Sequence, residues 1–582
     1  MNEKSSIIQK IDLCIVQISR IGDVLQTIRA LQLFFKGPTT LSILFIGRKE
    51  FAGPLEFLLK KYCKHIIYLD FKNNLNRTSE KALLKQYVSD FISSINQYEI
   101  DKCVNLSFSK TSSYLCSLIK ASQKLGLSRD KDDNLSISDP WCQYVYSVVM
   151  RGCWNPFNLV DIFISVLESL KLRQEVTMTI LPSEPLRISQ NTTSVVVHPF
   201  ASIDKKRWEV SKWAYIINYL LSNIPNIEII VVGAKSDTIE GEKLFSDDLI
   251  QNCFGKVTNK IGQTSLEQLY EVMRCSSMFM GHDSMCGHLA AIANIPCVTI
   301  SLGSVRSHET APYGNENFVI APKVACYPCY PDTLCNGLYC HKTISAWLVA
   351  SFVSSFFERI IDKCVTYNAI DSFLDRAASV DIASIILYKS GLDKNNKLFL
   401  DPLNIIDADA PMLFRLYYHI IWSFVLEDKE INFSIPPISS LVATEIQNYL
   451  EGIKYIFELN VFGEQYSQFV LDECSNKRPQ LDKIKSYIGK ISEIDGMSLG
   501  LKEKFSLLSP IVDYYYVNRT NLPGKNMIQL ASNSLLNFKE ANCTLNILNE
   551  FILKTIEDYR SKQNVFDSEI NISGKSPHIT EL

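Results

Sequence analysis

The chain has 582 residues, of which 47% are hydrophobic and 21% charged, and its 59 basic and 62 acidic side chains leave a net charge of −3. This is the composition of a globular protein, and 30 Phe, 26 Tyr and 6 Trp residues exclude disorder as the main state. The balanced charge argues against a nucleic-acid partner, because proteins that wrap nucleic acid carry a basic excess. The length corresponds to about three to five domains, or to fewer large ones.

The sequence pattern shows no signal for export or membrane insertion. Residues 1–10 are polar and lack the apolar core of a signal peptide. The longest apolar stretches, at 347–357 and 417–426, are too short to cross a bilayer. The 17 cysteines are spaced irregularly, which fits reduced thiols better than a framework of disulfides. We therefore expect a cytoplasmic protein without a transmembrane segment.

The first part of the chain alternates between predicted strands and helices. Residues 13–18 are rich in β-branched side chains and predict a buried strand, which Gly22 and Asp23 follow. Apolar residues then recur at helical spacing over 24–34. Further strands are predicted at 41–46, 66–69 and 102–106. This alternation predicts βαβ units and a parallel sheet.

A polar segment without periodicity, 183–194, predicts a linker, and a second α/β series follows it. Its strands are expected at 195–198, 227–232, 278–280 and 298–302, and its helices at 208–221, 266–274 and 288–293. We predict one α/β domain at 1–185 and another at 194–365. Two such domains that face a cleft are a common way to hold a nucleotide-linked substrate.

The pattern changes after about residue 366. Helical periods are found at 382–391, 412–426, 441–457 and 534–559. We therefore predict a mostly α-helical domain over 366–582, with a frayed end from about Ser568. Its aromatic residues are expected to form mainly core, because aromatics at helical spacing usually do.

Three blocks of the α/β part, taken in order across residues 12–345, resemble glycosyltransferase family nine, the ADP-heptose:lipopolysaccharide heptosyltransferases and their relatives. The first block reads QISRIGDVLQT at 17–27. The second reads HPFAS at 198–202, followed by KRW at 206–208. The third reads GHDS at 281–284, HLAA at 288–291, IP at 295–296 and APYG at 311–314. Residues 366–582 lie outside the resemblance.

The resemblance implies a bacterial glycosyltransferase of the GT-B type, in which two Rossmann-like domains face a cleft. Residues 1–185 would form the acceptor-side domain and 194–365 the donor-nucleotide domain. The implied reaction moves a heptose-type sugar from a nucleotide-diphosphate donor, ADP-heptose in the first place, to an acceptor hydroxyl with inversion. The enzyme would be cytoplasmic or peripheral at the inner membrane. Lys206 and helix N-termini could replace a metal ion on the diphosphate, so we expect no cofactor for catalysis.

Asp23 is the predicted general base. It follows a strand end, where α/β folds place ligands, and a carboxylate there can take a proton from a sugar hydroxyl. The alternative is a helix cap, for which Asp is also favoured. The resemblance supports catalysis, because the base of the family lies at the matching position.

The predicted donor-binding residues come from the second and third blocks. Lys206 stands before a helix, where its charge suits a diphosphate, although a lysine beside Lys205 and Arg207 could equally be solvated. The other candidates for the donor site are Ser202, Asp283, Ser284, Gly287 and His288. His288 could instead be a satisfied core or capping histidine. The sequence departs from the family at Met285, because the family usually has Gly directly after the Ser or Thr.

Four cysteines, Cys326, Cys329, Cys335 and Cys340, fall within fifteen residues. Four thiolates at short spacing can form a structural zinc or iron site. The alternative is a loop of buried or free thiols, and the sequence leaves both hypotheses open. Some family members also carry a Cys-rich stretch here, and the resemblance gives it no catalytic role.

Two other functions stay open. One is a protein O-glycosyltransferase of the same fold that modifies a flagellin or autotransporter instead of lipopolysaccharide core. The other is a non-catalytic relative whose α/β part is a scaffold. The helical extension must bury its apolar faces on itself, on the α/β part or on a partner. We expect it to recognise a protein acceptor or to mediate homo-oligomer formation.

Overall fold

The computed structural model describes residues 9–70, 81–152, 154–172, 193–253, 257–330, 333–335, 337–361, 373, 382–431 and 434–573. The chain divides into two compact units, of which the first comprises 1–142 and 157–404 and the second comprises 143–156 and 405–582. The predicted linker at 183–194 lies outside the described residues as far as residue 192.

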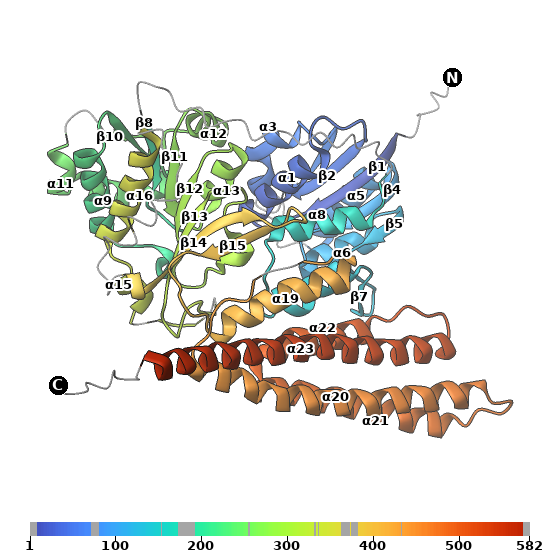
Figure 1. Cartoon of the computed structure of the whole chain (residues 1–582). Helices are drawn as coiled ribbons and strands as arrows, with labels where there is room; N and C mark the ends of the chain where they lie inside the picture. Colours follow the sequence, from blue (N-terminus) through green and yellow to red (C-terminus); the bar gives the residue numbers. More distant parts are fainter. Residues whose placement is uncertain are drawn as a thin grey trace, which may run out of the picture. The chain divides into compact units, whose positions relative to one another are not determined.

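The first lobe of the α/β unit is built on five parallel strands in the order β3-β2-β1-β4-β5 (Figure 1). The strands are β1 (Lys10–Gln17), β2 (Ile43–Arg48), β3 (His65–Leu69), β4 (Glu99–Asn105) and β5 (Ala121–Leu125). The helices around them are α1 (Ile21–Phe35), α2 (Lys49–Ala52), α3 (Glu56–Leu59), α5 (Lys81–Asn96), α6 (Lys110–Leu118) and α8 (Leu159–Ser169). A small hairpin of β6 (Leu127–Arg129) and β7 (Leu135–Ile137) and the helix α7 (Pro140–Tyr144) follow β5. The predicted strands and first helix are confirmed.

The second lobe carries an eight-stranded sheet in the order β10-β9-β8-β11-β12-β13-β14-β15. Its parallel strands are β8 (Thr193–His198), β9 (Ile227–Val231), β10 (Val257–Asn259), β11 (Met278–His282), β12 (Cys297–Ile300) and β13 (Phe318–Pro322). Its helices are α9 (Val210–Asn223), α10 (Thr238–Phe245), α11 (Asp248–Gln251), α12 (Leu266–Arg274), α13 (Met285–Ile292), α14 (Ser307–Thr310), α15 (Tyr339–Thr343) and α16 (Ala346–Ile361). Two short 3₁₀ turns, η3 (Asp204–Lys206) and η4 (Lys235–Asp237), follow β8 and β9.

The prediction of a helix at 382–391 is wrong. Residues Ile385–Leu392 form strand β14, which pairs antiparallel with β13, and Leu398–Pro402 forms β15 beside it. Ile385 and Leu387 are buried in the core of the second lobe. A short apolar run fits a buried helix and a buried strand equally well, so the neighbouring strand β13 decided the outcome. The α/β unit thus reaches Asn404, whereas we expected the helical region to begin near residue 366.

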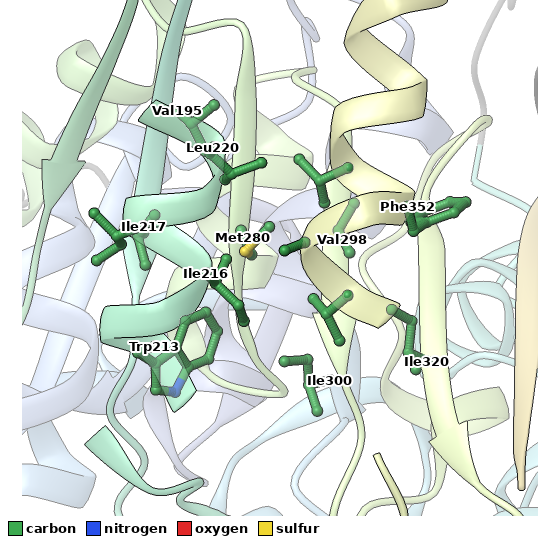
Figure 2. Packing of buried hydrophobic residues seen from close by; sticks show 14 of the residues in the cluster. Val195, Trp213, Ile216, Ile217, Leu220, Met280, Val298, Ile300, Ile320 and Phe352 are labelled. Atoms are coloured by element: carbon green, nitrogen blue, oxygen red, sulfur yellow. The ribbon is translucent and has the colours of Figure 1, made fainter. Parts of the chain in front are cut away.

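The core of the second lobe is a dense layer between the sheet and helices α9 and α16. Figure 2 shows Trp213 and Ile216 of α9 pointing at Met280 and Ile300 of the sheet, with Phe352 of α16 beside them. Each of these side chains is almost fully buried. Burial of this kind contributes about 1.5–3 kcal/mol per large apolar side chain, which keeps the carboxyl ends of the strands in place.

The second unit is α-helical, as predicted. Its helices are α19 (Ala410–Glu427), α20 (Ser440–Ser475), α21 (Leu481–Lys504), α22 (Ser509–Thr520) and α23 (Met527–Ser573). A 3₁₀ turn at Ser506–Leu508 lies between α21 and α22, and the segment 143–156 adds a π-helical turn at Val145–Val149. The long helices α20 and α23 run side by side (Figure 1). Tyr417, Tyr418 and Trp422 of α19 are buried, which confirms the aromatic core. The frayed end predicted from Ser568 is helical to Ser573, and the remainder lies outside the described residues.

Buried charges also join the elements of the helical unit. Asp513 is almost fully buried and accepts from Arg151 and Lys502, each at 2.6 Å. Arg151 lies in the segment 143–156, so this ion pair ties a distant part of the sequence to the helices. No helix in the described part of the chain is long and apolar enough to cross a membrane.

Candidate functional site

Each parallel sheet reverses its strand order at one strand, and the predicted site residues follow these strands. β1 lies between β2 and β4, and β8 lies between β9 and β11. Asp23 comes after β1, Lys206 after β8, and Asp283 after β11. The carboxyl ends of strands at such a reversal are where open α/β sheets bind ligands. The topology therefore puts all three residues where binding is expected.

The N-termini of α1 and α13 lie against each other, which brings the two lobes together at the site. A Cβ built on Gly22 would lie 3.6 Å from Cδ2 and 3.9 Å from Nε2 of His288. The imidazole of His288 therefore lies against Gly22, the residue before Asp23, in the first turn of α1. The backbone that carries the predicted base thus passes close to a predicted donor-binding residue.

Asp23 is both a helix cap and a candidate base. Its Oδ2 accepts a hydrogen bond of 3.0 Å from the backbone N–H of Arg20, at the start of α1. Within the described residues its Oδ1 accepts no hydrogen bond. Burial raises the pKa of Asp23, while the Arg20 backbone N–H and charge oppose the shift. A carboxylate with one free oxygen and a raised pKa is suited to accept a proton.

Lys206 and Asp283 form an ion pair in the second lobe. Lys206 Nζ lies 3.6 Å from Asp283 Oδ2, and both side chains are mostly buried. Lys206 ends the short turn η3, so it precedes α9 by several residues instead of lying on it. Burial lowers the pKa of His288, with opposing effects from Asp283 and Lys206, so its imidazole is neutral at pH 7. The three residues predicted from different blocks are therefore electrostatic neighbours.

Ser284 is the N-cap residue of α13, yet its side chain makes no capping hydrogen bond. Its Oγ instead lies 3.3 Å from Nδ1 of His198, at the end of β8. Burial lowers the pKa of His198 to about 4, so this partner is neutral. The first N–H groups of α13 are thus left without a side-chain cap, which is the arrangement that binds anions.

Two predicted donor residues are not part of this cluster. Ser202 is exposed, and no hydrogen bond joins it to Lys206, Asp283 or Ser284 in the part of the chain that the structure describes. Gly287 lies inside α13, where a Cβ would come within 3.3 Å of Cγ of Pro312. Because Gly287 has no side chain beyond a hydrogen atom, α13 can pack closely against the loop after α14. Their roles toward a donor stay predictions.

Sequence reasoning missed His282, which ends β11 and binds residues at and before the start of α9. Its Nε2 accepts from the backbone N–H of Trp208 at 3.1 Å and from Nε1 of Trp213 at 3.3 Å. Burial lowers its pKa to about 3, so it accepts these bonds as a neutral ring. A signal was present, because a histidine directly before Asp283 ends an otherwise apolar strand.

A buried polar cluster across the two lobes was also missed. Asp161 of α8 accepts from the Tyr313 hydroxyl at 2.5 Å and from the backbone N–H of Leu398 at 3.0 Å. Burial raises the pKa of Asp161 to about 7, although Lys397 lowers it. Lys397 itself lies over the ring of Trp141, with Nζ 4.3 Å from the ring centroid. Contacts so distant in sequence leave no local pattern.

The four cysteines of the predicted metal site form no disulfide bond with any described residue. No group of three or more His, Cys, Asp or Glu side chains is arranged to hold a metal ion within the described ranges. Burial and the neighbouring thiols nevertheless raise the pKa of Cys329 and Cys340, so the four side chains lie in one region. A cavity of about 540 Å³ lies at this loop, lined by Val324, Ala325, Cys326, Tyr339, Lys342 and Thr343. None of the other predicted site residues lines it.

Comparisons with known proteins find one family model and several similar proteins. Residues 89–339 match the family model described as glycosyltransferase family 9 (heptosyltransferase). The chain is 24% identical over 332 residues to lipopolysaccharide heptosyltransferase 1 of Campylobacter coli, which covers 53% of this chain and 88% of that protein.

Two solved structures are also similar to the chain. A family 9 glycosyltransferase of Veillonella parvula has 15% identity and a TM-score of 0.45, and the match covers 60% of this chain and 98% of the other. The heptosyltransferase WaaC of E. coli, solved with ADP, has 16% identity and a TM-score of 0.41, with coverage of 52% and 91%.

The family match contains the whole donor-side cluster. Lys206, Asp283, Ser284 and His288 fall inside residues 89–339, whereas Asp23 precedes them. The family match falls mainly on the α/β unit. Residues 89–339 of the chain are thus similar to glycosyltransferase family 9, the heptosyltransferase family.

Proposed function

We propose that the protein is an inverting glycosyltransferase that moves a heptose from ADP-heptose to an acceptor hydroxyl. The observation that supports this proposal is the packing of Gly22, the residue before Asp23, against His288, with the Lys206–Asp283 ion pair near the same imidazole. One lobe supplies a proton acceptor and the other supplies groups that bind an anion. The choice of a heptose is supported by the C. coli relative, which is named a lipopolysaccharide heptosyltransferase.

In the proposed reaction, Oδ1 of Asp23 accepts the proton of the acceptor hydroxyl. The hydroxyl oxygen forms a bond to the anomeric carbon while the bond from that carbon to the diphosphate oxygen breaks, and the nucleoside diphosphate leaves. A single displacement of this kind inverts the anomeric centre. The raised pKa of Asp23 increases its strength as a base toward a hydroxyl.

The departing diphosphate gains negative charge, and the second lobe offers groups that stabilise it. Lys206 supplies a full positive charge, the hydroxyl of Ser284 and the neutral ring of His288 supply hydrogen bonds, and the first N–H groups of α13 add partial positive charge. Asp283 holds the ammonium group of Lys206 in the site. These groups need no catalytic metal ion to act on the diphosphate.

The proposal is tested with purified protein and two donors, ADP-heptose and UDP-N-acetylglucosamine. We expect turnover of the first and none of the second, with an anomeric configuration opposite to that of the donor by NMR. Retention of configuration, or equal turnover of both donors, would contradict the proposal. Absence of donor turnover under all conditions would support a non-catalytic scaffold instead.

A protein acceptor is the second candidate, and the helical unit favours it. Tyr455, Phe462 and Phe469 of α20 are exposed at seven-residue spacing, so they share one face of the helix. Such a face suits recognition of a protein acceptor or formation of a homo-oligomer. Transfer assays with lipopolysaccharide core and with whole-cell protein as acceptors distinguish the two candidates, and light scattering measures the oligomeric state. Fractionation of cells tests the expected location in the cytoplasm or at the inner membrane.

The cysteine-rich loop remains a proposed structural zinc or iron site. Elemental analysis of protein purified without chelator should find about one metal ion per chain if Cys326, Cys329, Cys335 and Cys340 bind it. Metal below a tenth of this amount would establish the free-thiol alternative.

A further inference from the structure

The cysteine-rich loop and α15 pack directly against the turn that carries Lys206. The side chain of Lys205 reaches into this loop, where its Nζ donates to the backbone carbonyls of Tyr330 at 3.0 Å and Thr333 at 3.4 Å. Lys205 and Lys206 are adjacent in η3, but their side chains therefore have different partners. One is engaged with the loop, and the other is directed to Asp283.

The peptide unit between Lys205 and Lys206 is held at both ends. Its N–H, that of Lys206, donates to the Ile203 carbonyl at 2.9 Å. Its C=O, that of Lys205, accepts from Nε2 of His341 at 2.8 Å. A carbonyl oxygen only accepts, so His341 carries its proton on Nε2. A 3₁₀ turn of three residues has little rigidity of its own, so the hydrogen bond from His341 adds an outside restraint to the peptide from which Lys206 extends.

His341 is itself firmly held and almost fully buried. Its backbone carbonyl accepts from Nε1 of Trp208 at 3.0 Å and from Nζ of Lys212 at 2.5 Å. Trp208 also donates its backbone N–H to His282, which directly precedes Asp283. Hydrogen bonds through Trp208 thus link His341, which holds the backbone before Lys206, to His282, which precedes Asp283, the ion-pair partner of Lys206.

Gly303 also contacts the peptide unit between Lys205 and Lys206. Its φ of +62° lies in the left-handed region, and a Cβ there would lie 2.5 Å from the carbonyl oxygen of Lys205. The backbone N–H of Cys329 donates to the Gly303 carbonyl at 2.9 Å. A cysteine of the loop therefore holds Gly303, and Gly303 is pressed against the same peptide unit that His341 holds.

We propose that His341, supported by the cysteine-rich loop, is a positioning residue that holds Lys206 ready for the diphosphate of the donor. This inference rests on the proposed function, because it assigns a support to the residue that binds the phosphates there. It gives the cysteine-rich loop a role in donor binding that does not require any of its thiols to touch the substrate. Movement of the loop would shift the Lys205–Lys206 peptide and lower the affinity for the nucleoside diphosphate.

The test compares two substitutions of His341 in the full chain. A glutamine places an N–H near the position of Nε2 and can still donate to the Lys205 carbonyl, whereas a leucine cannot. ADP affinity is measured by calorimetry, and folding by circular dichroism and thermal unfolding. We expect His341→Leu to weaken ADP binding roughly three- to tenfold, the size of one lost hydrogen bond, and His341→Gln to stay within about twofold of the wild type.

A double-mutant cycle with Lys206→Ala separates positioning from a general structural effect. If His341 acts through Lys206, His341→Leu should not weaken ADP binding further when Lys206 is already alanine. An equal loss in both backgrounds would overturn the inference. If Lys206→Ala alone leaves ADP binding unchanged, the proposed function fails instead, so the two failures are distinguishable.

A second variant keeps the inference testable if His341→Leu does not fold. Lys205→Met removes the hydrogen bonds to Tyr330 and Thr333 while keeping an unbranched apolar stem. We expect it to weaken ADP binding roughly three- to tenfold in the wild-type background and not in the Lys206→Ala background. The matched control is Lys243→Met, whose exposed side chain pairs with Glu240 in α10. A loss of the same size in this control would contradict the role of Lys205.

Discussion

The two lobes of the α/β unit share one plan but carry different chemical groups at the equivalent place. Both sheets are parallel around a strand where the order reverses, β1 in the first lobe and β8 in the second. The first lobe presents the carboxylate of Asp23 there, whereas the second presents Lys206 with Ser284 and His288. The fold thus provides a location, and under the proposed function the side chains after each strand determine whether a lobe accepts a proton or binds an anion.

The largest effect should come from Asp23→Asn, which removes the proton acceptor of the first lobe. An amide oxygen can still accept from the Arg20 N–H, so the helix cap survives. We expect kcat to fall by about 10²–10⁴-fold, or about 3–5 kcal/mol of barrier, with ADP affinity nearly unchanged. The control is Asp247→Asn, which alters the N-cap of α11 and should leave kcat as it is. Wild-type turnover in Asp23→Asn would show that Asp23 is only a helix cap and not the general base.

The second lobe differs from the first in its two antiparallel strands, and Leu387→Ala tests how much they contribute to the free energy of unfolding. Leu387 of β14 is 1% exposed, and Leu392 of the same strand is 41% exposed. Removing the buried side chain should cost about 2–5 kcal/mol of unfolding free energy, because it leaves a cavity. The matched Leu392→Ala should change it by less than about 0.5 kcal/mol. Equal effects in urea denaturation would mean that β14 is peripheral to the core.

Lys206→Ala tests the anion-binding side of the comparison. Loss of a charged hydrogen-bond donor should weaken ADP binding roughly 10- to 100-fold, which corresponds to about 1.5–3 kcal/mol. Turnover should fall as well, because the diphosphate gains charge in the transition state. Calorimetry with ADP and steady-state kinetics measure the two effects, with Lys243→Ala as an exposed control. A variant with lower stability but wild-type ADP affinity would make Lys206 purely structural.

The last prediction concerns the pH dependence of stability at Asp161, where the two lobes meet. Burial raises the pKa of Asp161 to about 7, from about 3.9 in the unfolded chain. Between these values the unfolded chain releases the proton first, so this group makes the folded state less stable as pH rises from 4 to 7. In Asp161→Asn this dependence should disappear, a difference of at most about 1.4 kcal/mol per pH unit.

Thermal unfolding of wild type and Asp161→Asn at several pH values measures this difference. The exposed loop variant Asp132→Asn serves as control and should follow the wild type at each pH. Parallel curves for wild type and Asp161→Asn would show that Asp161 titrates alike in both states.

Sequence patterns predicted the elements whose signals are local. The strands and helices around Asp23, Lys206 and Asp283 were found, because buried parallel strands are continuous apolar runs and helices repeat at 3.6 residues. Strand β14 was mistaken for a helix, since its pairing with β13 is not encoded in its own residues. His282, His341 and Asp161 were missed because each acts through partners far away in the sequence.

The sequence by itself indicated the resemblance to glycosyltransferase family nine, the two α/β lobes, the helical C-terminal part and the residue types after each strand. These follow from the spacing of apolar, small and charged residues over a few turns of the chain. Tertiary structure alone decided that Gly22 contacts His288, that Lys206 pairs with Asp283, and that His341 holds the peptide before Lys206. Such contacts join segments more than a hundred residues apart or different strand ends, so only the packing of complete lobes brings them together.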